Sequence, residues 1–208
     1  MYTGNFNLIP NAIELGRFAY SEEKRNLLRG QLKVEDQFVI GHIGRYVDVK
    51  NQKFLLKVAC YLTDIPSVIL LFGWGEEKAD LEKEIEELNL QNRVLIMGAR
   101  DNISDYYNVF DVLAFPSKYE GLSLVLVEAQ ANGCPVVASN RISLESKLSD
   151  RFSFLSIEES EDNYRIWAEQ LKQYMGARHT EAKEELSRAG YNIEVEAKKL
   201  ESFYLNRQ

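Results

Sequence analysis

Short apolar runs alternate with longer amphipathic segments from Phe38 onward, and this alternation constrains the fold more than any other feature. The apolar runs cover residues 38–44, 67–73, 93–98, 111–117 and 135–139. Continuous apolar runs of this length, separated by helical patterns, are typical of strands in a parallel sheet that is buried on both faces. The sequence therefore predicts an α/β fold, with helices covering both faces of the sheet.

The segments between the runs have helical periodicity. They predict helices over 51–63, 76–89, 103–110 and 122–132, the last closed by Gly133. The first helix should direct Phe54, Leu55, Val58 and Leu62 inward, and the second Leu81, Ile85 and Leu88. Beyond residue 150 we expect a short strand near 152–157 and helices around 162–176, 180–190 and 193–206. The segment 1–37 contains no complete strand–helix unit of its own.

Composition excludes several classes of protein. With a net charge of −7 the chain lacks the basic surface that broad nucleic-acid binding requires, so no nucleic-acid partner is expected. The apolar runs are too short to span a bilayer, and the first residues lack the pattern of a signal peptide. Cys60 and Cys134 lie in apolar contexts, which favours free thiols. With two histidines, His42 and His179, and no CxxC, no metal site is expected.

Ligands of open parallel sheets bind at the carboxyl ends of the strands. Four loops there have suitable residues: 41–50, 72–76, 98–102 and 118–123. Gly-rich turns that lead into helices favour phosphate, and Arg45 and Lys50 could add contacts to two phosphates. The alternative is that both are ordinary surface residues. Neither GxGxxG nor GxxxxGK[ST] occurs, so a dinucleotide fingerprint and a P-loop are absent.

Two glutamates flank the start of the predicted helix 122–132. Glu120 precedes a glycine in the loop, and Glu128 follows four apolar residues, where an ionised carboxylate requires a partner. Both carboxylates could border one cleft, where a carboxylate could accept two hydrogen bonds from a vicinal diol. A polar stripe that Glu128 shares with Asn132 would be a purely structural explanation. No GxSxG, HExxH or Asp-x-Asp motif supports hydrolase, zinc or metal-diphosphate chemistry.

Taken in order along the chain, these motifs resemble the carboxyl-terminal half of retaining GT-B glycosyltransferases of family 4, "glycosyl transferases group 1". The matching stretches are IPNAIE (9–14), HIGRYVDVKN (42–51), LLFGWGE (70–76) and VLIMGARDNISDYYNVFDVLAFPSKYEGLSLVLVEAQANGCPVVAS (94–139). Ala12 stands where the family usually has a hinge glycine, and EGLSL replaces the more common EGFGL-type loop. The resemblance implies a Rossmann-like domain that forms one half of a GT-B fold.

The resemblance also implies a role for each site residue. Gly44, Arg45 and Lys50 match the loop that binds the donor diphosphate, and Arg100 lies in the loop near the base. Glu120 matches the glutamate at the donor sugar, to which a catalytic contribution is ascribed. Gly121, Leu122 and Ser123 match the loop whose amides approach sugar and phosphate, and Glu128 matches the glutamate that holds the ribose hydroxyls. The donor would be a UDP-, GDP- or ADP-sugar, with no metal and no other cofactor.

Family organisation gives three expected segments: a hinge or linker at 1–20, a donor-binding domain at 21–190 and a C-terminal helix at 191–208. The amino-terminal acceptor domain of the family is missing, so this chain should bind donor and transfer sugar poorly alone. The resemblance suggests a role in capsule or exopolysaccharide assembly, with an acceptor glycan or lipid-linked sugar as partner. The expected location is the cytoplasm or the inner face of the membrane. The alternatives are a GT-B-fold nucleotide-sugar epimerase and a non-catalytic nucleotide-sugar-binding or interaction domain.

Overall fold

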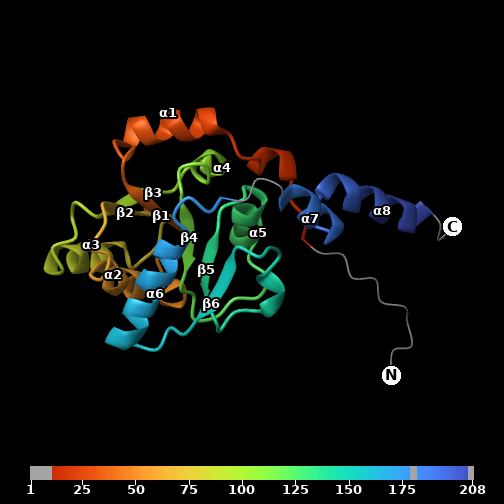
Figure 1. The fold of residues 1–208 in the computed structure, drawn as a ribbon. Helices are drawn as coiled ribbons and strands as arrows, with labels where there is room; N and C mark the ends of the chain where they lie inside the picture. Colours follow the sequence, from red (N-terminus) through yellow and green to blue (C-terminus); the bar gives the residue numbers. More distant parts are fainter. Residues whose placement is uncertain (1–10, 179–181, 206–208) are drawn as a thin grey trace, which may run out of the picture.

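A six-stranded parallel sheet forms the centre of the molecule. The structure is a computed structural model that describes residues 11–178 and 182–205. The strand order is β3-β2-β1-β4-β5-β6, and every pairing is parallel (Figure 1). The strands are β1 (Phe38–Ile43), β2 (Ser67–Phe72), β3 (Val94–Gly98), β4 (Val112–Phe115), β5 (Val136–Ser139) and β6 (Phe152–Leu155). The five strands predicted from the apolar runs and the short strand expected near 152–157 are therefore confirmed, and the Rossmann-like fold class with them.

The chain reverses its direction of progress across the sheet between β1 and β4. From β1 it builds outward through β2 to β3, then returns to place β4 on the other side of β1. The helices that follow β1 and β4 consequently lie on opposite faces of the sheet, and the loops that lead to them lie side by side at the carboxyl edge. Ligands of such sheets bind at this switch point, so the topology directs attention to the loops after Ile43 and Phe115.

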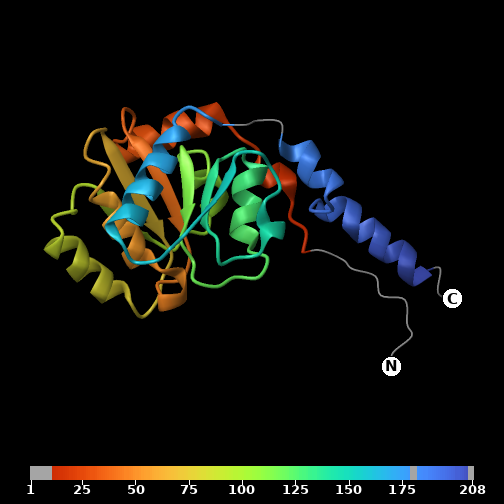
Figure 2. The same cartoon turned by 60° about the horizontal axis from the view of Figure 1, so that its bottom comes forward.

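Alternate residues of each strand face two separate cores. Val39 and Leu70 belong to one cluster of buried residues, whereas Ile40 and Leu71 belong to the other. Helices α2 (Gln52–Ala59), α3 (Lys78–Glu87) and α6 (Glu161–Gln173) cover the second face, and α1 (Glu22–Leu32), α4 (Ile103–Tyr106) and α5 (Leu124–Ala131) cover the first (Figures 1 and 2). Burial on both faces explains why the central strands are apolar throughout rather than alternating.

Helix α1 was not predicted from the sequence, because polar residues dominate it. Ser21 caps its first turn by accepting from the Lys24 amide, and Lys33, at φ 57°, ends it. The helix is attached by charge: Arg25 and Arg29 both pair with Asp111, whose side chain is largely buried. Ion pairs between residues 80 or more apart in sequence leave no periodic apolar pattern to detect.

Three short 3-10 helices and two carboxyl-terminal helices complete the described chain. They are η1 (Leu15–Phe18), η2 (Asp48–Lys50), η3 (Leu144–Ser146), α7 (Ala182–Arg188) and α8 (Ile193–Leu205). Figures 1 and 2 show α8 extending away from the sheet. Ile13 forms an isolated parallel bridge with Asn192, so the segment before η1 contacts the segment that leads into α8. Within the described ranges, none of the helices has the length and apolarity needed to cross a bilayer.

The predicted inward residues lie where expected. Phe54, Leu55, Val58 and Leu62 are fully buried, and Leu81 and Ile85 are buried while Leu88 is half-buried. Both cysteines are free, with Cys134 buried and Cys60 half-buried. Gly133 ends α5 in the left-handed region at φ 70°. His179, together with the first two residues of the IPNAIE stretch, lies outside the described residues.

Candidate functional site

The loops after β1 and β4 are joined to each other at the switch point. The Lys118 amide donates to the Val49 carbonyl at 2.8 Å, and the Asn51 side chain donates to the Pro116 carbonyl at 3.2 Å. An ion pair between Lys118 and Asp48 adds a third connection. Two loops that are 65 or more residues apart in sequence therefore form one structural unit at the carboxyl edge.

Lys50 and Glu120, one from each loop, form an ion pair in this unit. Both side chains are less than one-fifth exposed, at 17% and 19%. The Lys50 ammonium also lies 5.2 Å from the centroid of the Phe115 ring, a cation–π contact. The prediction that these two residues share one site is consistent with this contact, although a diphosphate bound at Lys50 would compete with Glu120 for the same charge.

Glycines allow the loop after β2 to pack directly against the loop after β1. A Cβ on Gly73, whose φ is 147°, would lie 1.9 Å from the Gly44 carbonyl oxygen, and one on Gly75 would lie 2.3 Å from the Tyr46 carbonyl oxygen. The Tyr46 amide donates to the Trp74 carbonyl at 2.8 Å across this contact. The glycines of FGWGE thus have a packing role that holds the Arg45 loop in place.

A small pocket of about 200 Å³ lies between these two loops and the loop after β3. Gly44, Arg45 and Arg100 line it together with Trp74, whose ring lies under the Arg45 guanidinium at 4.8 Å. The remaining lining is mostly apolar: Ile43, Phe72, Gly73, Ala99 and Ile103. Two exposed arginines beside an exposed indole form a cationic pocket that is suited to an aromatic or anionic group.

The first turn of α5 is the third element at the switch point. Ser123 is its N-cap residue but makes no side-chain capping hydrogen bond, and the preceding Gly121 is exposed. Leu122 is half-buried beside them. The first amides of α5 have no partner within the helix, and the Gly121–Ser123 segment leads directly into them, so this edge offers N–H donors to an anion.

Glu128 has a partner that the sequence analysis did not identify. The Tyr107 hydroxyl donates to Glu128 Oε2 at 2.6 Å, and Tyr107 is fully buried. Burial raises the pKa of the Glu128 carboxyl, while the tyrosine hydrogen bond and the nearby Arg17 charge act in the opposite direction. Glu128 therefore lies at the boundary between core and solvent, with one carboxylate oxygen engaged by the protein.

The polar-stripe explanation for Glu128 is not supported. Asn132 is buried, and its side chain donates to the Phe18 carbonyl at 2.9 Å and accepts from Arg178. The Glu128 and Asn132 side chains make no hydrogen bond to each other among the described residues. The two residues meet only through the helical backbone, where the Asn132 amide donates to the Glu128 carbonyl at 3.0 Å. No periodic signal in the sequence marks Tyr107 as its partner, because the contact joins two elements across the core.

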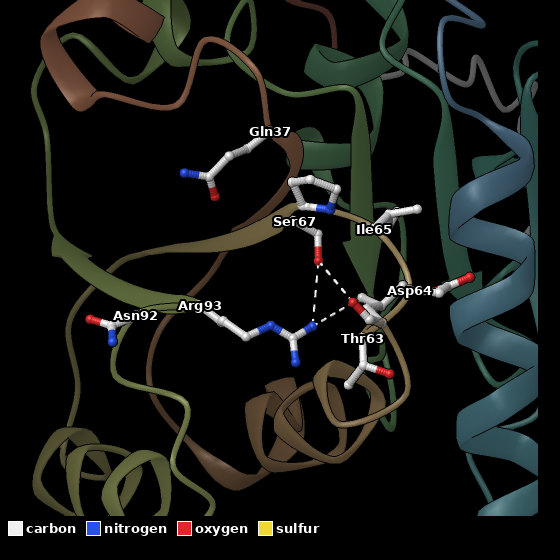
Figure 3. Close-up of a pocket in the computed structure, with 9 residues that line it drawn as sticks. Gln37, Thr63, Asp64, Ile65, Ser67, Asn92 and Arg93 are labelled. Carbon is white, nitrogen blue, oxygen red and sulfur yellow. Dashed lines mark hydrogen bonds between the residues drawn. The ribbon is translucent and has the colours of Figure 1, made fainter.

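A larger pocket lies at the opposite, amino edge of the sheet, with a volume of about 580 Å³ (Figure 3). Its main cation, Arg93, is already engaged, since it donates to the Leu62 carbonyl at 2.7 Å and faces Ser67 at 3.5 Å. Gln37, Thr63, Asp64 and Asn92 complete the polar lining. None of the predicted site residues lines this pocket, so size does not identify the functional site here.

No group of three or more His, Cys, Asp or Glu side chains within the described ranges is placed to hold a metal ion. Positive charge at the switch point comes instead from Arg45, Lys50 and Arg100, together with the N-terminus of α5.

Comparison with known proteins identifies the family. A family model described as "Glycosyl transferases group 1" matches residues 23–192. The chain belongs to this family. It is 33% identical over 196 residues to the putative glycosyltransferase EpsF of Bacillus subtilis, covering 90% of this chain and 50% of the relative. It is 34% identical over 140 residues to the UDP-Gal:alpha-D-GlcNAc-diphosphoundecaprenol alpha-1,3-galactosyltransferase of Escherichia coli, covering 64% and 36%.

Solved structures of glycosyltransferases share the fold. Anabaena Alr3699/HepE, crystallised with UDP, matches with a TM-score of 0.80 and 24% identity over 95% of this chain and 57% of that protein. The expected Rossmann-like half of a GT-B glycosyltransferase is thereby confirmed. The chain spans half or less of the length of these two curated relatives.

Proposed function

We propose that this chain is the donor-binding part of a retaining glycosyltransferase that moves a sugar from a nucleotide diphosphate to a hydroxyl acceptor. The observation that carries the proposal is the convergence of Arg45, Lys50, Glu120 and the first turn of α5 at one switch point. A relative named for polysaccharide synthesis, the Vi polysaccharide biosynthesis protein VipC/TviE of Salmonella typhi, supports assembly of a cell-surface polysaccharide as the process.

The donor would lie with its diphosphate at the edge of the sheet. Arg45, Lys50 and the amides of Gly121 to Ser123 surround this position and would stabilise the negative charge that develops on the leaving diphosphate. The base would occupy the pocket beside Arg100, and the ribose hydroxyls would donate to Glu128. A UDP-, GDP- or ADP-sugar fits these groups, and the Anabaena structures with UDP and UDP-glucose favour UDP.

The reaction would break the bond between the sugar C1 and the diphosphate oxygen and form a bond from C1 to the acceptor oxygen. Retention follows if the acceptor attacks from the face that the diphosphate leaves, with the acceptor proton passing to the departing oxygen. Glu120 would stabilise positive charge on the sugar ring and, through its contact with Lys50, would couple that charge to the diphosphate. Lysine, arginine and amide groups supply the required charge, so no metal is included in this mechanism.

The acceptor would be a glycan or a lipid-linked sugar. It would bind to the region of the longer relatives that the alignment with this chain does not cover. Transfer would take place in the cytoplasm or at the inner face of the membrane. On this proposal the 208-residue chain binds donor and transfers sugar poorly on its own. Detection of efficient transfer by this chain alone would refute that point without affecting the donor site.

Thermal unfolding with UDP, GDP and ADP, and with NAD as a control, tests donor binding. A ligand present at about a hundred times its Kd stabilises by roughly 2.7 kcal/mol, which corresponds to a rise in Tm of about 5–11 °C for a domain of this size. We expect one nucleoside diphosphate to produce the shift, with no need for a divalent cation and no loss in EDTA. Equal, negligible shifts with all four ligands would count against the proposal and favour a non-catalytic domain.

A further inference from the structure

His42 is a buried polar residue beside the site for which neither the motifs nor the proposed mechanism provides a role. It is the fifth residue of β1, fully buried, and its ring lies 6.5 Å from that of Phe115 at the end of β4. Its Nδ1 lies 3.0 Å from the Ala114 carbonyl oxygen. Because a carbonyl oxygen can only accept, Nδ1 carries the proton and the neutral ring has its lone pair on Nε2.

Gln52, the first residue of α2, completes the arrangement. Its amide nitrogen lies 3.1 Å from His42 Nε2 and 2.8 Å from the Arg45 carbonyl oxygen. An amide nitrogen has two hydrogens, and here one is directed to the ring and the other to the Arg45 backbone. A continuous set of hydrogen bonds therefore connects the Ala114 carbonyl in β4 to the carbonyl of Arg45.

The two acceptors that face the Gln52 side chain determine which way its amide is oriented, because only the nitrogen can donate to them. If the amide were flipped, Oε1 would face two other acceptors, the His42 Nε2 lone pair and the Arg45 carbonyl oxygen, and neither contact could be a hydrogen bond. In the observed orientation Gln52 Oε1 is buried and has no partner among the described residues. Proteins seldom leave such an acceptor unpaired in the core, which suggests that the two contacts of the nitrogen are retained for a reason other than stability.

Lys50 lies against the same group. A Cβ placed on Gly44 would be 3.4 Å from His42 Nε2 and 3.3 Å from Lys50 Cδ, so the ring and the lysine stem both border the space that a side chain at Gly44 would occupy. Burial, with a contribution from the Lys50 charge, lowers the pKa of His42 to about 4, which keeps the ring neutral near pH 7. A neutral ring adds no competing cation beside Lys50.

We propose that His42 and Gln52 are positioning residues that hold the backbone of Arg45 and the stem of Lys50 in the geometry needed for the donor diphosphate. Their hydrogen bonds link β4, which leads to Glu120, to the loop that carries both cations. The inference rests on the proposed donor site and adds two residues to it, neither of which touches the donor directly.

The test separates recognition of the diphosphate from recognition of the nucleoside. The full chain is titrated by calorimetry with UDP, GDP and ADP, and with the corresponding nucleosides. For the nucleotide that binds, the result is the ratio of the dissociation constant of the nucleoside to that of the diphosphate. Gln52→Met keeps the side-chain length but removes both hydrogen bonds. We expect it to weaken binding of the diphosphate by about tenfold while leaving the nucleoside unchanged, since only the phosphate contacts depend on Arg45 and Lys50.

Gln130→Met is the matched control. Gln130 is equally buried, at 1% exposed, and its amide nitrogen likewise donates to two carbonyls, those of Leu126 and Ser146 at 2.9 Å each. The control should lose stability but keep the wild-type ratio. His42→Phe, which retains an aromatic ring and removes the link to Gln52, should reproduce the effect of Gln52→Met.

The outcomes are distinct. If the wild-type chain binds none of the three diphosphates, the proposed function fails and this inference fails with it. If the wild type binds and Gln52→Met and His42→Phe both fold and keep the wild-type ratio, the inference alone is overturned. An equal loss for diphosphate and nucleoside would indicate a purely structural role and would also overturn it.

Discussion

The Tyr107 hydroxyl donates to Glu128 Oε2 at 2.6 Å, and this pair connects the packed core to the candidate ribose site. Tyr107 lies immediately after α4 and is fully buried, whereas Glu128 lies on the second turn of α5 and is half-buried. The tyrosine uses one carboxylate oxygen and restricts the rotamer of the glutamate. The other oxygen has no protein partner among the described residues, which suits an acceptor for sugar hydroxyls.

Replacement of this glutamate should change binding far more than folding. In Glu128→Gln the side chain keeps an oxygen that can accept from Tyr107. It loses the negative charge, which burial disfavours at this position. We expect the free energy of unfolding to change by less than about 1 kcal/mol, and the affinity for nucleoside and nucleotide alike to fall by about tenfold or more. Calorimetric titration and urea unfolding measure the two quantities.

Glu196→Gln provides the control for that experiment. Glu196 is also a buried glutamate, it pairs with Lys199 at 2.7 Å, and it lies on α8 rather than at the switch point. Its replacement should leave nucleotide affinity unchanged. A large loss of stability in Glu128→Gln with unaltered affinity would show that Glu128 is a structural residue.

Lys50 and Glu120 should respond to mutation in opposite directions. Lys50→Met removes a cation from the diphosphate position, and we expect nucleoside diphosphate affinity to fall by about tenfold. Glu120→Gln removes the carboxylate that competes for Lys50. Because a partly exposed ion pair contributes up to about 1 kcal/mol, affinity in Glu120→Gln should stay constant or rise by as much as fivefold. Lys57→Met, which breaks the remote pair with Glu84, should leave the affinity unchanged.

The glycine after β2 should be irreplaceable for a steric reason. In Gly73→Ala the new Cβ would lie 1.9 Å from the Gly44 carbonyl oxygen, and the backbone conformation there is unfavourable for any side chain. We expect a loss of about 3 kcal/mol or more in unfolding free energy, and weakened nucleotide binding as the Arg45 loop shifts. Gly98→Ala is the matched comparison, because Gly98 has φ 71° but open space at its Cβ, and should cost only about 1 kcal/mol.

Acid should destabilise the fold through His42. Its pKa is lowered from 6.5 to about 4 by burial, so between these values the unfolded chain binds a proton that the folded chain does not. Stability consequently decreases as the pH falls from about 6.5 to about 4, by on the order of 3 kcal/mol from this group. Urea unfolding at a series of pH values measures the slope, and His42→Phe should flatten it across this window. An identical slope in the two proteins would contradict the assignment.

Local pattern was sufficient for the sheet. Continuous apolar runs predicted the first five strands, and the sixth was expected near 152–157. The helix predicted over 122–132 starts two residues before α5 and ends one residue after it. Burial on both faces of a parallel sheet imposes a pattern that is visible in any short window, which is why these elements could be read directly. Helix α1 was not predicted because ion pairs with Asp111, rather than an apolar stripe, hold it in place.

The sequence by itself determined the α/β class, the order of the strands along the chain and the residue types of the candidate site: Arg45, Lys50, Glu120 and Glu128. Only the tertiary structure decided which strands are neighbours and which side chains meet. The pairing of Lys50 with Glu120 spans 70 residues, that of Tyr107 with Glu128 crosses the core, and the His42–Gln52 link depends on ring orientation. Such contacts follow from the three-dimensional position of whole elements, and they cannot be predicted from local hydrophobic periodicity.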